Sequence, residues 1–170
     1  MIEPPKPDYR IGIGTDIHRL ATGRKLMLGG VLISTDMGLV GHSDGDVALH
    51  AIIDALLGAA GMGDIGTLFP DTDPKYKDAD SKGLLLDVRE KLTEKRWEIV
   101  NVDLTIHAEH PRLEKFKGQM KRCVADLLGI DFGSVNIKAK TNEGLDAVGE
   151  GLAIAATAIV LLHEKYKRTL

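Results

Sequence analysis

Two histidines and an aspartate are spaced so that they could bind a metal ion together. Asp16 and His18 stand two residues apart in Arg10–Leu20, whose alternating apolar residues predict a strand, so their side chains point to the same side. His50 follows in a predicted helix. Three nitrogen and oxygen ligands with a fourth position open to water or substrate are typical of a catalytic zinc site. The sequence therefore predicts a zinc centre formed by these three residues.

Two other interpretations of the same residues remain. An aspartate and two histidines also form the two-histidine, one-carboxylate iron site. That site usually sits on an all-β barrel, which this sequence does not predict, so zinc is favoured. Alternatively, His50 is an ordinary helix histidine and the Asp16-x-His18 pattern arises by chance.

The segment Gly41–Ala60 is predicted to be a polar turn that leads into an apolar helix, and it carries His50. Ser43 or Asp44 is expected to cap the first turn. Asp46, His50 and Asp54 lie four residues apart and are expected to share one face of the helix. Asp46 or a nearby carbonyl could then orient the His50 ring, unless the two aspartates are simply solvated.

Further residues suggest phosphate chemistry. His42 and Ser43 stand at the predicted helix N-terminus, where unpaired N–H groups favour an anion. Thr141, Asn142 and Glu143 follow a predicted strand, and a carboxylate near bound phosphates commonly holds Mg²⁺ or Mn²⁺. Metal, helix N-terminus and carboxylate together indicate phosphoryl transfer.

The elements that must position these residues alternate between strands and helices. The hydrophobic pattern and turn residues first predict a strand in Arg10–Leu20, a hairpin over Lys25–Ile33 that turns at Gly29-Gly30, and the Gly41–Ala60 helix. A helix over Ser81–Arg96, capped by Ser81, and a strand over Trp97–Ala108 follow. The last predicted elements are a helix from Pro111 to Leu128, a strand over Val135–Lys140 and a buried apolar helix from about Leu152 to Lys167. We expect an α+β fold, a two-layer α/β sandwich with a ferredoxin-like mixed sheet and helices on one face. Residues 1–8 are expected to be a disordered lead-in to a single domain over residues 9–170.

The segment Gly61–Asp80 is predicted to be a long irregular loop. Loops of this length in compact domains are usually functional or disordered. The apolar residues Ile65, Leu68 and Phe69 punctuate it, which favours a lid or substrate-binding loop over a plain surface loop.

Composition excludes several classes of function. A net charge of −3 over 170 residues argues against general binding to nucleic acid or to an anionic membrane. Cys123 is the single cysteine, so an internal disulfide and a cysteine-rich zinc site are excluded. The sequence has no apolar run long enough for a membrane span, and its N-terminus does not resemble a signal peptide. The expected location is a reducing cytoplasm.

Four motifs resemble the 2-C-methyl-D-erythritol 2,4-cyclodiphosphate synthase family of the non-mevalonate isoprenoid pathway. They are G-x-D-x-H-R at Gly14–Arg19, HSDGDVALHAIIDALLGAA at His42–Ala60, GDIG-x-x-FPDTD at Gly63–Asp73, and KAKTNE at Lys138–Glu143. The resemblance implies a homotrimer with active sites between subunits. It also implies that 4-diphosphocytidyl-2-C-methyl-D-erythritol 2-phosphate is converted to the cyclic diphosphate and CMP, as the 2-phosphate attacks the β-phosphorus.

The resemblance also implies a role for each matching residue. Asp16, His18 and His50 would hold zinc, with Ile17 beside them in contact with substrate, and His42 and Thr141 would stabilise the transition state. His42 and Ser43 would line the substrate loop, and Glu143 would hold the second divalent ion, Mg²⁺ or Mn²⁺. The remaining contacts would be Asp64, Ile65 and Gly66 to the ribose, Phe69, Pro70, Asp71, Thr72 and Asp73 to the methylerythritol phosphate, Ala108, Glu109, His110, Pro111, Arg112, Leu113 and Glu114 to cytosine, and Lys140, Thr141, Asn142 and Glu143 to the diphosphate.

One segment departs from the family pattern. Leu145–Gly151 reads LDAVGEG, two residues shorter than in many bacterial members and without their aromatic and arginine residues. In those members the two residues line a central cavity that holds an isoprenoid diphosphate, and the resemblance does not extend to this ligand. Two alternatives to the synthase remain open: a non-catalytic metal- or nucleotide-binding module, and a zinc phosphohydrolase that activates water.

Overall fold

The computed structural model describes residues 8–33, 35–76 and 79–165. Its elements in chain order are β1 (Tyr9–Thr22), β2 (Leu26–Leu28), β3 (Val31–Ile33), β4 (Met37–Leu39), α1 (Val47–Ala60), α2 (Ile65–Leu68), a 3₁₀ turn (Pro74–Tyr76), α3 (Ser81–Glu94), β5 (Trp97–His107), a 3₁₀ turn (Glu114–Phe116), α4 (Lys117–Leu128), a 3₁₀ turn (Phe132–Ser134), β6 (Val135–Lys140), α5 (Asp146–Gly149) and β7 (Ala153–Glu164). Apart from Asp8, the expected disordered lead-in falls outside the described residues. None of the helices in the described ranges is long and apolar enough to cross a membrane.

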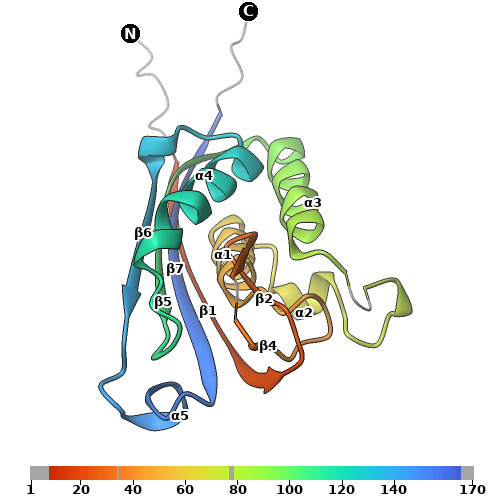
Figure 1. The fold of residues 1–170 in the computed structure, drawn as a ribbon. Helices are drawn as coiled ribbons and strands as arrows, with labels where there is room; N and C mark the ends of the chain where they lie inside the picture. The colour runs from red at the N-terminus through yellow and green to blue at the C-terminus, as the bar shows by residue number, and fades with distance from the viewer. Residues whose placement is uncertain (1–7, 34, 77–78, 166–170) are drawn as a thin grey trace, which may run out of the picture.

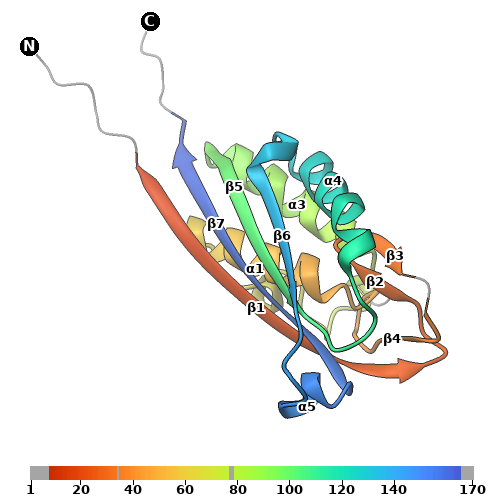
Figure 2. The same ribbon diagram turned by 60° about the vertical axis from the view of Figure 1, so that its left-hand side comes forward.

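The main sheet has five strands in the order β4-β1-β7-β5-β6, and helices α1, α3 and α4 pack on one of its faces (Figure 1, Figure 2). Strand β7 runs antiparallel to both β1 and β5, and β6 runs parallel to β5. The predicted two-layer α+β architecture with a mixed sheet is confirmed. The predicted hairpin is also confirmed as β2 and β3, which turn at Gly29 and Gly30.

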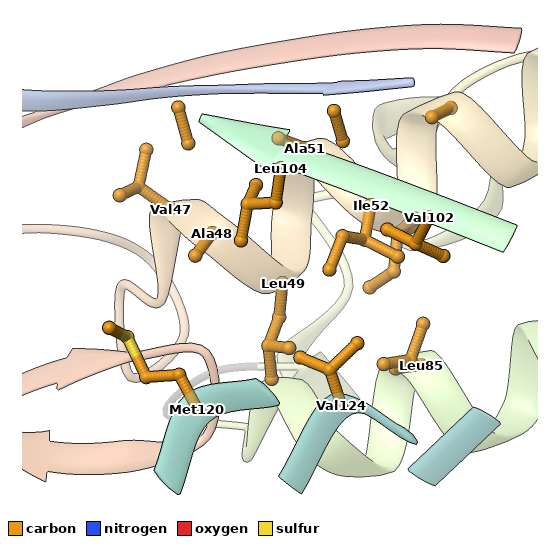
Figure 3. Close-up of a cluster of buried hydrophobic side chains, with 14 of the residues drawn as sticks. Val47, Ala48, Leu49, Ala51, Ile52, Leu85, Val102, Leu104, Met120 and Val124 are labelled. Carbon is orange, nitrogen blue, oxygen red and sulfur yellow. The ribbon is translucent and has the colours of Figure 1, made fainter. Parts of the chain in front are cut away.

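The hydrophobic core lies around α1, which is buried between the sheet and the other two long helices. Figure 3 shows Val102 and Leu104 of β5 on one side of α1, and Val124 of α4 on the other. All three of these side chains are almost completely buried, as is Leu49 of α1 between them. This burial fixes the position of α1, and therefore of the residues at its N-terminal end.

Strand β1 packs its backbone directly against α1 because it presents glycines to that helix. A Cβ on Gly12 would overlap the carbonyl oxygen of Ala55 and lie 2.8 Å from the amide nitrogen of Ala59. A Cβ on Gly14 would overlap the carbonyl oxygen of Ala51 in the same way. The isoleucines that alternate with these glycines therefore face the opposite side of the sheet.

The expected last helix, Leu152 to Lys167, is wrong over its described part: Ala153–Glu164 forms the central strand β7. The β7 positions that face away from the helices, such as Ala155, Ile159 and Leu161, are apolar as well, so its sequence is a nearly continuous apolar run without clear alternation. Such a run cannot be distinguished from a buried helix by periodicity alone. The β-branched residues Ile154, Thr157, Ile159 and Val160 are the signal that favours a strand.

Several element boundaries also differ from the prediction. Pro111 does not begin a helix: α4 begins at Lys117, after a turn in which the buried Leu113 accepts backbone hydrogen bonds from Phe116 and Lys117. The N-cap of α3 is Asp80 rather than Ser81. The Gly61–Asp80 segment is not wholly irregular, since it contains α2 and a 3₁₀ turn.

The N-cap of α1 is Asp46, not Ser43 or Asp44. Its carboxylate accepts hydrogen bonds from the backbone N–H groups of Ala48 and Leu49, which are among the groups left unpaired at a helix start. The same carboxylate accepts the N–H groups of Gly29 and Gly30 at 2.9 and 2.6 Å. Asp46 therefore ties the β2–β3 turn to the start of α1, and it is fully buried rather than solvated.

Candidate active site

Asp16, His18 and His50 meet at one point, where the second half of β1 passes the first turn of α1. The Nδ1 atom of His50 lies 2.9 Å from Asp16 Oδ2 and 3.1 Å from His18 Nε2. The Nε2 atom of His18 lies 3.0 Å from the same Asp16 oxygen. Two residues of a strand and one of a helix thus direct one ligand atom each at a common centre.

The two imidazoles control the charge of Asp16. Burial raises the pKa of Asp16, but hydrogen bonding with the rings of His18 and His50, together with their charge, outweighs that effect. The net result is a pKa well below the usual range of an aspartate. Asp16 is therefore a carboxylate at neutral pH, which is the form that binds a cation.

The three ligand atoms fit a divalent metal ion. In a tetrahedral site with bonds of about 2.0–2.1 Å, ligand atoms are separated by roughly 3.3 Å. The separations in the triad fall short of this by only a few tenths of an ångström, and all three atoms lie within 4.8 Å of one another. Imidazole nitrogens with a carboxylate are a donor set that several divalent transition metals accept.

The other ring nitrogen of His50 faces two buried serines. His50 Nε2 lies 2.9 Å from Ser81 Oγ and 3.0 Å from Ser43 Oγ. The expectation that Asp46 orients this ring is wrong, because the Asp46 carboxylate is engaged by backbone N–H groups. Sequence reasoning missed Ser81 as a partner of His50. Only the tertiary structure brings it there, at the start of a different helix.

A cavity of about 340 Å³ opens beside the triad. Its lining contains nine of the predicted site residues, namely Asp16, His18, His42, Ser43, His50, Ile65, Gly66, Phe69 and Asp71. Three further lining residues were not among the predicted site residues: Asp54, Tyr76 and Leu84. The predicted lid segment after α1 therefore does contribute to this cavity.

Asp54 connects α1 to the segment that follows it. One of its carboxylate oxygens accepts the backbone N–H of Ile65 at 2.7 Å. Burial raises the pKa of Asp54, with the hydrogen bond from Ile65 acting in the opposite direction. The i+4 spacing from His50 was the available signal for this residue, since it places both side chains on the same side of the helix.

Five predicted residues near this cavity do not line it. Ile17 points to the opposite side of β1 and is 57% exposed. Asp64 caps α2 by accepting the N–H of Thr67, and Asp73 accepts the N–H of Lys75. Pro70 and Thr72 lie in the same loop as Asp71, which does reach the cavity.

The remaining predicted residues form a second group at the ends of β5 and β6. These are Ala108–Glu114 and Lys140–Glu143. The Ala108 N–H donates to the Lys140 carbonyl at 2.9 Å, and the Thr141 hydroxyl donates to Glu143 at 3.0 Å. None of these residues lines the cavity beside the triad.

The sheet order explains why the two groups do not meet. Asp16 pairs with Ala156, which is level with Ile106 on β5, which in turn pairs with Ala139 on β6. Three interstrand spacings of about 4.8 Å each therefore separate β1 from β6, or about 14 Å. Within one chain, the triad and the Lys140–Glu143 turn are therefore well separated.

Comparison with known proteins identifies similar chains. The model of the YgbB family matches residues 9–163. The 2-C-methyl-D-erythritol 2,4-cyclodiphosphate synthase of Bordetella petrii is 54% identical over 91% of this chain and 95% of its own length. Among solved structures, the bifunctional IspDF of Campylobacter jejuni superimposes with a TM-score of 0.91 at 42% identity, covering 95% of this chain and 44% of the longer IspDF chain. The CDP complex of IspF from Plasmodium falciparum has a TM-score of 0.82 at 36% identity, covering 93% and 97% of the two chains.

Proposed function

The chain belongs to the YgbB family, and from this premise we propose how its residues perform the reaction for which its relatives are named. That reaction is the synthesis of 2-C-methyl-D-erythritol 2,4-cyclodiphosphate, catalysed by a lyase of isoprenoid precursor biosynthesis. The proposed substrate is 4-diphosphocytidyl-2-C-methyl-D-erythritol 2-phosphate. An oxygen of its 2-phosphate forms a bond to the β-phosphorus, the bond from that phosphorus to the bridging oxygen breaks, and CMP leaves.

The observation that carries the proposal is the convergence of Asp16, His18 and His50 on one point beside a cavity. We assign these residues as ligands of zinc. Bound there, zinc would act as a Lewis acid that polarises and orients the β-phosphate. The protein's own contribution is to hold the phosphates in line, with Ser43 and His42 at the cavity wall.

The other proposed roles belong to residues near the cavity beside the triad and to residues at the ends of β5 and β6. His42 and Thr141 would donate hydrogen bonds to the charge that develops on the transferred phosphorus. Asp64–Gly66 would contact the ribose and Phe69–Asp73 the methylerythritol phosphate. Ala108–Glu114 would hold cytosine, and Lys140–Glu143 the diphosphate, with Glu143 binding a second divalent ion, Mg²⁺ or Mn²⁺. A bound CDP in the Plasmodium falciparum relative supports a cytidine nucleotide as the ligand class.

We further propose that the active form is a homotrimer with active sites between subunits. The triad and the Lys140–Glu143 turn lie three strands apart in one sheet, so a complete site would need the turn of a second copy. The sheet face opposite α1, α3 and α4 supplies a surface for this contact. On it, Ile11, Ile13, Ile17 and Ile159 are between 45% and 75% exposed. The proposed location is the cytoplasm.

Phosphorus NMR of the purified protein with this substrate and Mg²⁺ tests the reaction. We expect a cyclic diphosphate and CMP, whose formation stops after zinc chelation and resumes when zinc is restored. Release of inorganic phosphate without the cyclic product would identify a phosphohydrolase instead. Binding without turnover by the zinc-loaded protein would identify a binding module.

Paired histidine variants test the assigned roles. His50→Ala should weaken zinc binding by more than about 100-fold and abolish turnover, while the circular dichroism spectrum stays unchanged. His42→Ala should keep zinc and lose about 10²–10³-fold in turnover, because it removes a transition-state donor and not a ligand. Full turnover by metal-free His50→Ala would contradict the zinc assignment.

A further inference from the structure

The two nitrogens of the His50 ring have different surroundings. Nδ1 faces the ligand atoms of Asp16 and His18. Nε2 faces the hydroxyls of Ser81 and Ser43 in a largely buried region: Ser81 is fully buried, and Ser43 and His50 are each 8% exposed. In a neutral imidazole only one of these nitrogens carries a proton, and the other has the lone pair that can bind a metal.

The hydrogen bonds of Ser81 decide which nitrogen is protonated. The Ser81 hydroxyl donates to Oδ1 of Asp44, and an ionised carboxylate can only accept. A hydroxyl has one proton, so once it is directed at Asp44, Ser81 Oγ can only accept a hydrogen bond from His50. Ser43 Oγ accepts the Gly45 N–H at 3.2 Å, and its own proton can turn to Ser81 Oγ at 3.4 Å, which leaves Ser43 Oγ able to accept from His50 as well. The proton of neutral His50 is therefore directed to Nε2.

We propose that Ser81 and Asp44 are positioning residues that hold His50 in its Nε2-protonated tautomer, with the Nδ1 lone pair directed at the metal position. The proposal rests on the assignment of the triad as the metal site. All the hydrogen bonds in this series are donated in one direction: His50 donates to Ser81, and Ser81 donates to Asp44. The Nδ1 atom of His50 is then free to bind the metal. Buried partners of this kind typically contribute 10–100-fold to metal affinity.

Asp44 also contacts the end of the Gly61–Asp80 segment and the start of α3. The Asp44 N–H donates to the Ala79 carbonyl at 3.1 Å, and the Ser81 N–H lies 3.4 Å from Asp44 Oδ2. Ala79 and Ser81 flank Asp80, the N-cap of α3. Asp44 thus connects the His50 ring, through Ser81, to the start of α3. The proposed tautomer of His50 therefore depends on two segments that are far apart in the sequence, one before α1 and one at the start of α3.

The test uses Ser81→Ala and Asp44→Asn in the full chain. Ser81→Ala removes the oxygen that accepts from Nε2. Asp44→Asn supplies an amide that can itself donate to Ser81, which frees the hydroxyl proton to turn toward His50. Long-range ¹H–¹⁵N correlation of metal-free protein, well above the ordinary histidine pKa of about 6.5, reports the tautomer directly. Competition with a chromophoric chelator reports zinc affinity.

The Asp16 carboxylate, 2.9 Å from Nδ1, competes for the proton in the metal-free protein, so we expect the wild type to hold a larger share of the Nε2-protonated form of His50 than either variant. Both variants should gain the Nδ1-protonated form, which would donate to Asp16, and should bind zinc about 10–100-fold more weakly. Ser81→Thr, which keeps the hydroxyl, should restore both readouts. Ser134→Ala, at the far edge of the sheet beside β6, should change neither.

Unchanged tautomer and unchanged zinc affinity in both variants would overturn the proposal. Should Ser81→Ala lose its native circular dichroism spectrum, the near-isosteric Asp44→Asn decides the question alone. A wild type that binds no zinc would instead refute the metal site, and the tautomer of the metal-free protein would still decide the role of Ser81.

Discussion

The two faces of the main sheet use opposite kinds of residue on the same strand. On the face covered by α1, strand β1 presents Gly12 and Gly14, which let the helix backbone approach closely. On the open face it presents Ile11 and Ile13, which are 75% and 65% exposed. In a monomer we would expect the larger apolar residues on the covered face, because burial of apolar area drives folding.

This inversion indicates that the two faces serve different contacts. The covered face brings β1 close enough to α1 for Asp16 and His18 to reach His50. The open face is suited to contact with another copy of the chain, as in the proposed homotrimer. The polarity of the open face is not uniform. Asp103, Asn136 and Lys138 make the part over β5 and β6 polar, whereas the part over β1 and β7 is apolar.

The largest effect is expected for Gly12→Ala on the covered face. The added methyl group would overlap the backbone of α1, which cannot move without disturbing the core, so the free energy of unfolding should fall by about 3 kcal/mol or more. Denaturant unfolding measures this. Gly118→Ala is the matched control, because its site in α4 is open. It should stabilise the protein by up to about 1 kcal/mol. Equal effects of the two variants would refute the close-approach explanation.

An intermediate effect is expected for Ile13→Lys on the open face. A charge at this position should dissociate the proposed trimer and stop turnover, while each subunit keeps its secondary structure. Light scattering coupled to size exclusion, with circular dichroism, checks both points. Leu32→Lys is the control: Leu32 is similarly exposed at 56%, but it lies on the β2–β3 hairpin rather than on this face. A wild-type monomer would contradict the assembly itself.

The smallest effect is expected for Asp103→Asn, at the polar part of the open face. The hydrogen bond from Lys138 lowers the pKa of Asp103, with burial acting against it. A lowered pKa means that the folded state favours the charged form, so this stabilisation is present above the ordinary aspartate pKa of about 3.9 and is lost as the pH falls below it.

Solvent screening keeps this contribution under about 1 kcal/mol, because both side chains are more than one-third exposed. Thermal unfolding of wild type and Asp103→Asn should therefore differ slightly at pH 7 and converge as the pH falls below the ordinary aspartate pKa. If the stability difference between wild type and Asp103→Asn instead grew as the pH was lowered, the predicted direction of the Asp103 pKa shift would be wrong.

Much of the site could be predicted because it depends on local geometry. Asp16 and His18 share a side of β1 through the two-residue repeat of a strand, and His50 lies on a helix whose apolar residues mark it clearly. Strands β5 and β6 were predictable for the same reason. The N-cap of α1 was not, since Asp44 and Asp46 are equivalent by sequence, and the choice follows from the contacts of Asp46 with Gly29 and Gly30.

The sequence alone determined the ligand types, the hairpin, two alternating strands and the helix that carries His50, because each is specified by neighbouring residues. Only the tertiary structure decided that Ala153–Glu164 is a strand, that Ser81 contacts His50, and that the triad and the Lys140–Glu143 turn lie apart. These features depend on which distant segments pair and pack. Strand order and helix packing are properties of the whole chain, and no local repeat encodes them.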